Sequence, residues 1–156
     1  MPWTNPRTWV SGETVTAALM NTHVRDNLKA VGDAWAAYTP ALTNWTLGNG
    51  TLTGAYMQAG KLTHYKIWYT VGSTDTPSGN LVFSLPGPVS GATGDSLGAA
   101  HILDTSASLR FNRFVCRSSS TTVYVADLSD AKVTHTVPVT FATGDTVRIL
   151  GAYEAS

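Results

Sequence analysis

The sequence predicts a mainly β protein, in which a short N-terminal helix precedes an antiparallel β-sandwich or jelly-roll head. Three observations indicate this fold class. The 156 residues include 23 Thr, 13 Ser and 14 Gly, a composition that suits strands and turns. One stretch near the N-terminus lacks Gly and Pro and repeats its apolar residues every three or four positions. Farther along, short apolar segments alternate with turn residues to the end of the chain.

Charge is low and balanced along the chain. Ten Lys and Arg match ten Asp and Glu, and charged residues make up 13% of the sequence, where about 25% is usual. A protein that follows a phosphate backbone needs an excess of basic residues, so we expect no nucleic-acid partner. No stretch approaches about 18 consecutive apolar residues, so we expect no membrane insertion. The N-terminus also lacks the basic and apolar regions of a signal peptide.

Residues 1–12 form an N-terminal arm with two prolines and two tryptophans. Pro2 and Pro6 disfavour a helix, whereas Trp3 and Trp9 can place two large indoles on another surface. We interpret the arm as a docking segment that contacts a neighbouring chain. The alternative is a tail that folds back on its own domain.

The residues after the arm predict a helix that starts at Val15, with Thr14 as its N-cap, and stops at Gly32. An apolar seam with alternating steps of four and three positions follows Ala17, Asn21, Val24, Leu28, Val31 and Trp35. A helix of about five turns is marginal alone in water, so its seam must be covered. We favour self-association, because Asn21 is a polar residue at a core position, where such residues set the register. The alternative is packing against the β domain of the same chain.

The rest of the chain predicts short strands separated by turns, so we divide the protein into residues 1–37, the arm and helix, and residues 38–156, the β-sandwich head. The expected strands are Ala41–Leu47, Thr51–Ala59, Leu62–Val71, Asn80–Leu85, Leu97–Leu103, Leu109–Cys116, Thr122–Asp127, Val133–Phe141 and Thr146–Tyr153. Strands of this length and spacing predict an antiparallel sandwich or jelly roll. The apolar register shifts from Phe111 to Phe114, which predicts a bulge near Asn112. Cys116, the single cysteine, is interpreted as a small buried residue of a strand.

One motif suggests catalysis. Gly94-Asp95-Ser96-Leu97-Gly98 matches the nucleophile elbow of hydrolases and the GDSL esterase signature. An elbow needs an apolar strand before the serine and a helix after it, whereas turn residues precede this serine and another strand is expected to follow. A GDSL enzyme also needs an Asp three residues before a late His, and Asp130 and His135 are five apart. We therefore expect a protein that is not an enzyme, with a GDSL-like esterase as a remote alternative.

Metal-binding patterns are weak in this sequence. The histidines lack the spacing of zinc ligands, and a single cysteine offers no pair; they are His23, His64, His101 and His135. Asp127 and Asp130 fit an ordinary polar turn better than a calcium loop. We predict no metal and no cofactor.

Tryptophans are the remaining candidates for ligand binding. Trp68 alternates with His64 and Lys66 on the polar face of its strand, where a sandwich leaves side chains exposed or between subunits. An exposed indole can stack on a sugar ring, because both have apolar faces and polar edges. Trp45, Trp68 and His64 are therefore the predicted ligand-binding residues. The alternative places Trp68 in a subunit interface.

Several segments share a pattern with a known family. They are Trp9 to Ala18, Met20-Asn21, Val24-Arg25-Asp26-Asn27-Leu28, Tyr38 to Tyr56, Gly60-Lys61, Phe83-Ser84-Leu85-Pro86, Gly144-Asp145-Thr146 and Gly151-Ala152-Tyr153-Glu154. These segments are spread over most of the length of the chain, from Trp9 to Glu154. With them the sequence resembles small minor tail and fibre proteins of phages that infect actinobacteria.

The resemblance implies a homotrimer, in which the helices form a bundle about a threefold axis with Asn21, Val24, Leu28 and Val31 at the trimer seam. It implies a virion protein made in the bacterial cytoplasm and placed on the tail or the particle surface. The N-terminal arm would dock on other virion proteins through Trp3 and Trp9, and the head would adhere to host cell-surface carbohydrate. Because the chain has no long shaft, a purely structural tail or capsid decoration stays open as the alternative.

Overall fold

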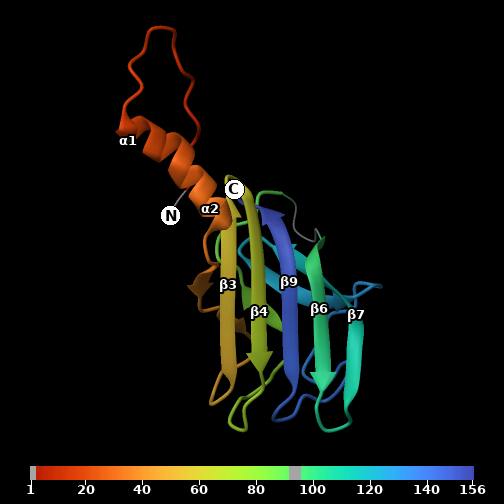
Figure 1. Ribbon diagram of the computed structural model, residues 1–156. Coiled ribbons are helices and arrows are strands. Elements are labelled where there is room, and N and C mark those ends of the chain that lie inside the picture. The colour runs from red at the N-terminus through yellow and green to blue at the C-terminus, as the bar shows by residue number, and fades with distance from the viewer. Residues whose placement is uncertain (1–2, 92–95) are drawn as a thin grey trace.

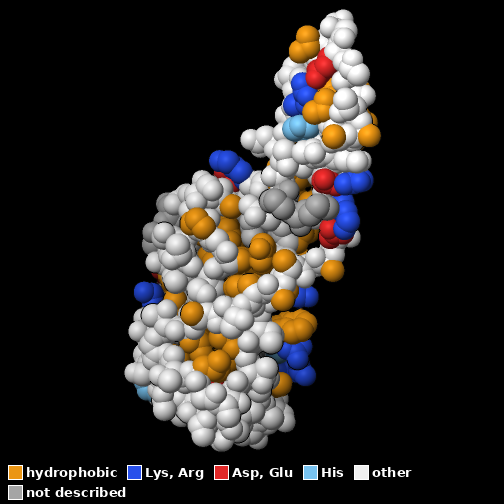
Figure 2. Space-filling view, turned by 90° about the vertical axis from the view of Figure 1, so that its left-hand side faces the viewer, with side chains coloured by type: hydrophobic (Ala, Val, Ile, Leu, Met, Phe, Trp, Pro, Cys, Tyr) orange, Lys and Arg blue, Asp and Glu red, His pale blue; other side chains and the backbone are white. Residues whose placement is uncertain are grey.

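The computed structural model describes residues 3–91 and 96–156 and has two parts (Figure 1). A short helical segment projects from a curled antiparallel sheet, and the chain is mainly β, with 46% strand and 11% helix. The predicted fold class is confirmed at this level. Figure 2 shows the helix and the arm as a narrow projection above a wider head, whose visible surface carries few charged side chains.

The helical segment runs from Ala17 to Gly32 and comprises α1 (Ala17–Met20), a π-helical turn η1 (Asn21–Arg25) and α2 (Asp26–Gly32). The predicted helix and its end at Gly32 are confirmed. Its N-cap is Thr16 rather than Thr14, because the Thr16 hydroxyl accepts the N–H of Leu19 at 3.3 Å. In η1 the Asp26 N–H donates to the Asn21 carbonyl five residues earlier. This wide turn interrupts the strict heptad spacing of the seam.

In the described part of the chain, nine strands follow the helix. They are β1 (Ala36–Tyr38), β2 (Leu42–Thr43), β3 (Thr51–Ala59), β4 (Leu62–Thr70), β5 (Val82–Ser84), β6 (Ser96–Asp104), β7 (Leu109–Ser119), β8 (Thr122–Asp127) and β9 (Thr146–Glu154). The predicted strand at Val133–Phe141 is wrong, because Pro138 lacks an N–H for a ladder and Thr134 and Val137 bond to each other in a turn. The edge strand β1 had no predicted counterpart.

The strands form one continuous sheet in the order β1-β3-β4-β9-β6-β7-β8-β5-β2, and every neighbouring pair is antiparallel. The last strand, β9, lies in the middle of the sheet, between β4 and β6. The sheet curls, so that its two ends approach each other (Figure 1). Tyr69 of β4 therefore packs edge-on against Phe83 of β5, with ring centroids 6.1 Å apart, although four strands separate β4 and β5 in the sheet order.

The core lies inside this curl. Fully buried side chains come from β4, β5, β6, β8 and β9 and include Ile67, Phe83, Ile102, Val125 and Ile149. Cys116 of β7 is also fully buried, as predicted. Burial disfavours the thiolate and raises the pKa of Cys116 to about 12, so this thiol is inert at neutral pH.

The predicted bulge of β7 is confirmed. Phe111 pairs with Ile102 and Phe114 pairs with Ala100, so two residues, Asn112 and Arg113, lie opposite the single residue between these partners. The extra residue lets Phe111 and Phe114 both face inward, while Asn112 reaches the opposite side of the sheet.

Candidate functional site

The candidate site is the outer face of the sheet, which we define by the solvent-facing side chains of β3, β4, β9, β6 and β7. Trp68 of β4 pairs with Arg148 of β9, and Arg148 pairs with His101 of β6. Two residues away on each of these strands, Lys66 of β4 pairs with Leu150 of β9. Side chains that pair directly or diagonally on one face of a sheet are neighbours, so the register brings two aromatic or apolar groups and three basic groups together.

Trp68 is the most exposed indole of the head, at 52%. The ammonium group of Lys66 lies 5.0 Å from the ring centroid of Trp68 and 5.0 Å from that of Trp35. Such distances allow cation–π attraction, which holds the Lys66 side chain between the two indoles. Trp35, which the sequence placed on the helical seam, lies beyond the end of α2 and contributes to the outer face instead.

Two hollows flank Trp68 and share it with Arg148 as a common wall. The larger, about 400 Å³, also contains Lys66, Ala99, His101, Asn112 and Leu150. The smaller, about 250 Å³, is lined mainly by threonines, namely Thr51, Thr53, Thr70 and Thr146. The exposed indole therefore lies between a mainly apolar hollow, with Lys66 and Arg148 among its lining residues, and a hollow lined by threonines.

The larger hollow has a positive character. Partial burial and the nearby charges of Arg110 and Arg148 lower the pKa of His101 below its ordinary value, so this imidazole is neutral at pH 7. Lys66 and Arg148 carry the charge that remains. None of the described residues that line either hollow is an Asp or a Glu.

The other two predicted ligand-binding residues do not join this site. Trp45 is 4% exposed and packs edge-on against Tyr69 and Phe141, with ring centroids 5.9 and 5.2 Å away. Its faces are covered by protein, so the prediction that Trp45 stacks on a ligand is corrected. His64 lies on the same face of β4 as Trp68 but four residues away, about 13 Å along the strand, and it lines neither hollow.

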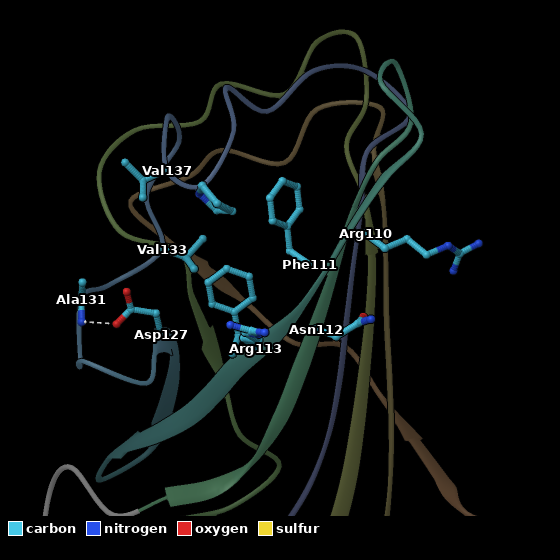
Figure 3. Close-up of a pocket in the computed structure, with 10 residues that line it drawn as sticks. Arg110, Phe111, Asn112, Arg113, Asp127, Ala131, Val133 and Val137 are labelled. Carbon is cyan, nitrogen blue, oxygen red and sulfur yellow. Dashed lines mark hydrogen bonds between the residues drawn. The ribbon is translucent and has the colours of Figure 1, made fainter.

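A separate pocket of about 430 Å³ opens at the edge of β7 (Figure 3). Phe111, Val133 and Val137 point into it, whereas Arg110 and Asn112 extend to the opposite side of β7. Asp127 lies at the rim, and one of its oxygens already accepts the N–H of Ala131 at 2.9 Å. Apolar side chains line this pocket together with the polar side chains of Arg113 and Asp127, and none of the predicted ligand-binding residues lies in it.

The predicted seam is exposed on the single chain. Val24, Leu28 and Val31 are 37%, 70% and 52% exposed, and Asn21 is half-buried. The buried residues of α2 are Asn27 and Ala30, on another side of the helix. The described part of the chain therefore leaves Leu28 and Val31 largely uncovered.

The N-terminal arm folds back near its start. Asn27 exchanges two hydrogen bonds with the backbone of Thr4, at 3.0 and 2.7 Å. Trp3 lines a hollow with Ala30 of α2 and Met57 of β3. Trp9, in contrast, is 39% exposed, and the guanidinium of Arg7 lies 5.0 Å from the centre of its ring. Of the two predicted docking residues, Trp3 thus contacts its own chain, and Trp9 is accessible.

Three further predictions concern residues elsewhere. The GDSL-like motif begins in residues 92–95, outside the described residues, and the structure gives no account of the Ser96 side chain. Within residues 3–91 and 96–156, no group of three or more His, Cys, Asp or Glu is arranged to hold a metal ion. No helix in the described part of the chain is long and apolar enough to cross a membrane.

Comparison with known proteins finds no match for this chain among family models, curated proteins or solved structures. The candidate site therefore rests on its own geometry.

Proposed function

We propose that the protein is a short homotrimeric tail fibre or minor tail protein of a phage, whose head adheres to carbohydrate on the host cell surface. The observation that carries the adhesive role is the exposed indole of Trp68, placed between two hollows on the outer face. Large exposed aromatic side chains flanked by polar groups suit sugar rings, which have apolar faces and polar edges.

The projecting helix supports the trimer. Val24, Leu28 and Val31 leave an apolar stripe in solvent, and such stripes on short helices are stable only when covered. Three copies packed through this stripe would place three heads side by side, each a curled sheet of the jelly-roll kind. Multivalent attachment of this kind lets weak sites act together.

The arm supports a position on the virion. Trp9 is exposed, and the loop that precedes α1 extends away from the head (Figure 1), so an apolar contact of the arm with another virion protein leaves the outer face free. A substitution at Trp9, rather than deletion of the arm, tests this contact, because Thr4 is bonded to Asn27.

Binding of labelled protein to actinobacterial cells tests the adhesive role. We expect the wild-type protein to label host cells, and Trp68→Ala to reduce labelling by about tenfold or more, since the loss of a stacking partner is multiplied over three heads. Trp9→Ala is the matched control, because it removes an exposed indole far from the outer face. Equal labelling by wild type and Trp68→Ala would contradict the proposal.

A purely structural decoration is the second candidate function. It is favoured by the exposure of Trp9 and of the seam, since both can make contacts within a particle without any use of Trp68. In that case the protein would bind no cells, and particles that carry Trp9→Ala or lack the protein would be incomplete or fragile.

A further inference from the structure

Charged side chains are distributed unevenly over this neutral protein. Five of its ten Lys and Arg form ion pairs in the described part of the chain, namely Arg7, Arg25, Lys29, Lys61 and Arg117. Of the other five, Lys66, Arg110 and Arg148 lie on the outer face, and none of them forms an ion pair with a carboxylate of the described residues. The outer face therefore carries a local excess of positive charge.

The register arranges these cations in a diagonal row. Lys66 is a diagonal neighbour of Arg148, because Trp68 is the direct partner of Arg148. Arg148 pairs with His101, and Arg110 pairs with Leu103, two residues beyond His101 on β6. The row extends three strand spacings across the sheet, about 14 Å, and four residues along the strands, about 13 Å, so its diagonal length is about 20 Å. An extended ligand can therefore meet more than one cation.

Each side-chain carboxylate of the described residues already has a partner. Those of the described residues either form the five ion pairs or accept backbone N–H groups, as Asp75, Asp104, Asp127 and Asp145 do. Lys66, Arg110 and Arg148 therefore have no carboxylate partner among residues 3–91 and 96–156, and an anionic ligand would supply one.

The number of cations favours a sugar over a nucleic acid. Tight binding to a phosphate backbone commonly uses six to ten phosphate contacts, about one basic group for each, and the outer face has three such groups. One or two isolated negative charges, combined with a stacking surface at Trp68 and hydroxyl partners at Thr53 and Thr70, match a saccharide that carries an occasional acidic group.

We infer that the outer face binds an anionic polysaccharide, which lies across Trp68 with its acidic group between Lys66 and Arg148. This inference deepens the proposed function and rests on it. The planar guanidinium of Arg148 can hold a carboxylate or a phosphate through two parallel hydrogen bonds. The indole of Trp68 stacks on the neighbouring sugar, whose hydroxyls reach the threonines of the smaller hollow.

Two matched pairs of probes test the charge requirement. The first pair is a hexamer of galacturonic acid and its methyl ester, which differ only in the carboxylate charge. The second pair is phosphomannan and neutral mannan. Titration of the full-length protein at about 50 mM and 500 mM salt should show binding to the charged member of at least one pair, weakened at high salt, where charges are screened within a few ångströms. The pair that binds identifies the acidic group.

Charge-removing variants test the residues. Arg148→Gln and Lys66→Gln should each raise the dissociation constant for the charged probe by about tenfold or more, because hydrogen bonds to charged groups are among the strongest. The matched control is Lys132→Gln, because the ammonium group of Lys132 also lies over an aromatic ring, 4.7 Å from the centroid of Tyr124, but away from the outer face. Its affinity for the probe should be unchanged.

Several results would overturn the inference. The first is equal affinity for the charged and the neutral member of both pairs. The second is that neither charged probe binds. The third is that Arg148→Gln binds the charged probe as tightly as the wild type does. A change of oligomeric mass in Arg148→Gln would instead identify the outer face as a subunit interface, and stronger binding to a single-stranded oligonucleotide would point to nucleic acid.

If Trp68→Ala abolishes cell labelling while Arg148→Gln leaves it intact, the proposed function stands and this inference fails. If the charged probe binds through Arg148 but no cells are labelled, the proposed function fails and the inference stands.

Discussion

Asp75 ties two loops together at one end of the head. Its carboxylate accepts the N–H groups of Gly48, Gly50 and Gly72, at 2.7, 3.0 and 2.8 Å, and the hydroxyl of Tyr69 at 2.7 Å. Burial acts to raise the pKa of Asp75, but these four donors outweigh it and lower the pKa below its ordinary value of 3.8. The charged form is therefore the form that stabilises the fold.

Asp75→Asn tests this role through its pH dependence. Because the folded pKa is depressed, the stabilisation is present above about pH 4 and is lost as the pH falls through the folded pKa. We expect the variant to lower the free energy of unfolding by about 1–3 kcal/mol at pH 7, with a smaller difference at pH 3. Urea unfolding at both pH values measures this difference.

Asp33→Asn is the control for that experiment, because Asp33 forms an exposed ion pair with Lys29 and such pairs contribute little. A difference between wild type and Asp75→Asn that stays constant from pH 7 to pH 3 would contradict the assigned role of the carboxylate.

Single residues also mark how far the sequence predicts the site. The alternation of polar and apolar residues along β4 correctly predicts that Trp68 is exposed and that its two neighbours are buried. Trp45 has a similar polar neighbourhood in the sequence, yet it lies in the core, since Asn44 next to it has a positive φ of 68° and breaks the alternation. Arg148 and Trp35 were missed, because only strand pairing and the path after α2 bring them to Trp68.

Among the elements, the helical segment carries the prediction of assembly. Leu28 is 70% exposed on the single chain, so Leu28→Asp should leave the head folded. In the proposed trimer the same change buries three like charges near the axis, which costs several kcal/mol. We expect the variant to sediment as a monomer at micromolar concentration, whereas the wild type sediments as a trimer.

Thr22→Asp is the matched control for Leu28→Asp, because it adds the same charge to an exposed position of the same helix, away from the seam. The variant should remain trimeric. If the wild type is a monomer, or if the Leu28→Asp variant is a trimer, the seam does not hold the subunits together.

The pairing of β6 with β9 depends on a glycine that allows close approach. Gly151 faces Gly98 across these strands. A Cβ added at Gly151 would lie 2.8 Å from the Tyr65 ring and closer still to the Leu97 carbonyl oxygen. Gly151→Ala should therefore cost about 1–3 kcal/mol through overpacking, as measured by thermal or urea unfolding.

Gly32→Ala provides the comparison for Gly151→Ala. A Cβ at Gly32 would have no heavy atom within 4 Å, and alanine favours a helix, so we expect unchanged or slightly raised stability. Equal stability of the two variants would show that the close approach at Gly151 can relax.

At the scale of the whole molecule, strand positions were far more predictable than strand order. Hairpins such as β3–β4 follow from turn residues at Gly60 and Lys61, since local signals specify local pairs. No local signal indicates that β9 inserts between β4 and β6. The strands form one continuous curled sheet, in which β5 pairs with β8 and β2 pairs with β5 at the far edge.

The central position of β9 has a consequence for the timing of folding. Strands β3 and β4 belong to one half of the sheet and β6, β7 and β8 to the other, and only Thr146–Glu154 joins the halves by backbone pairing in the middle. The ribosome synthesises that segment about 75 residues after β4. The edges of β4 and β6 that later pair with β9 therefore stay unpaired while the intervening chain is translated. Completion of the head is thus tied to the synthesis of its last strand. Nascent chains are exposed to edge-to-edge association until then, and finished heads, whose two outermost strands have only three and two residues, are largely protected from it.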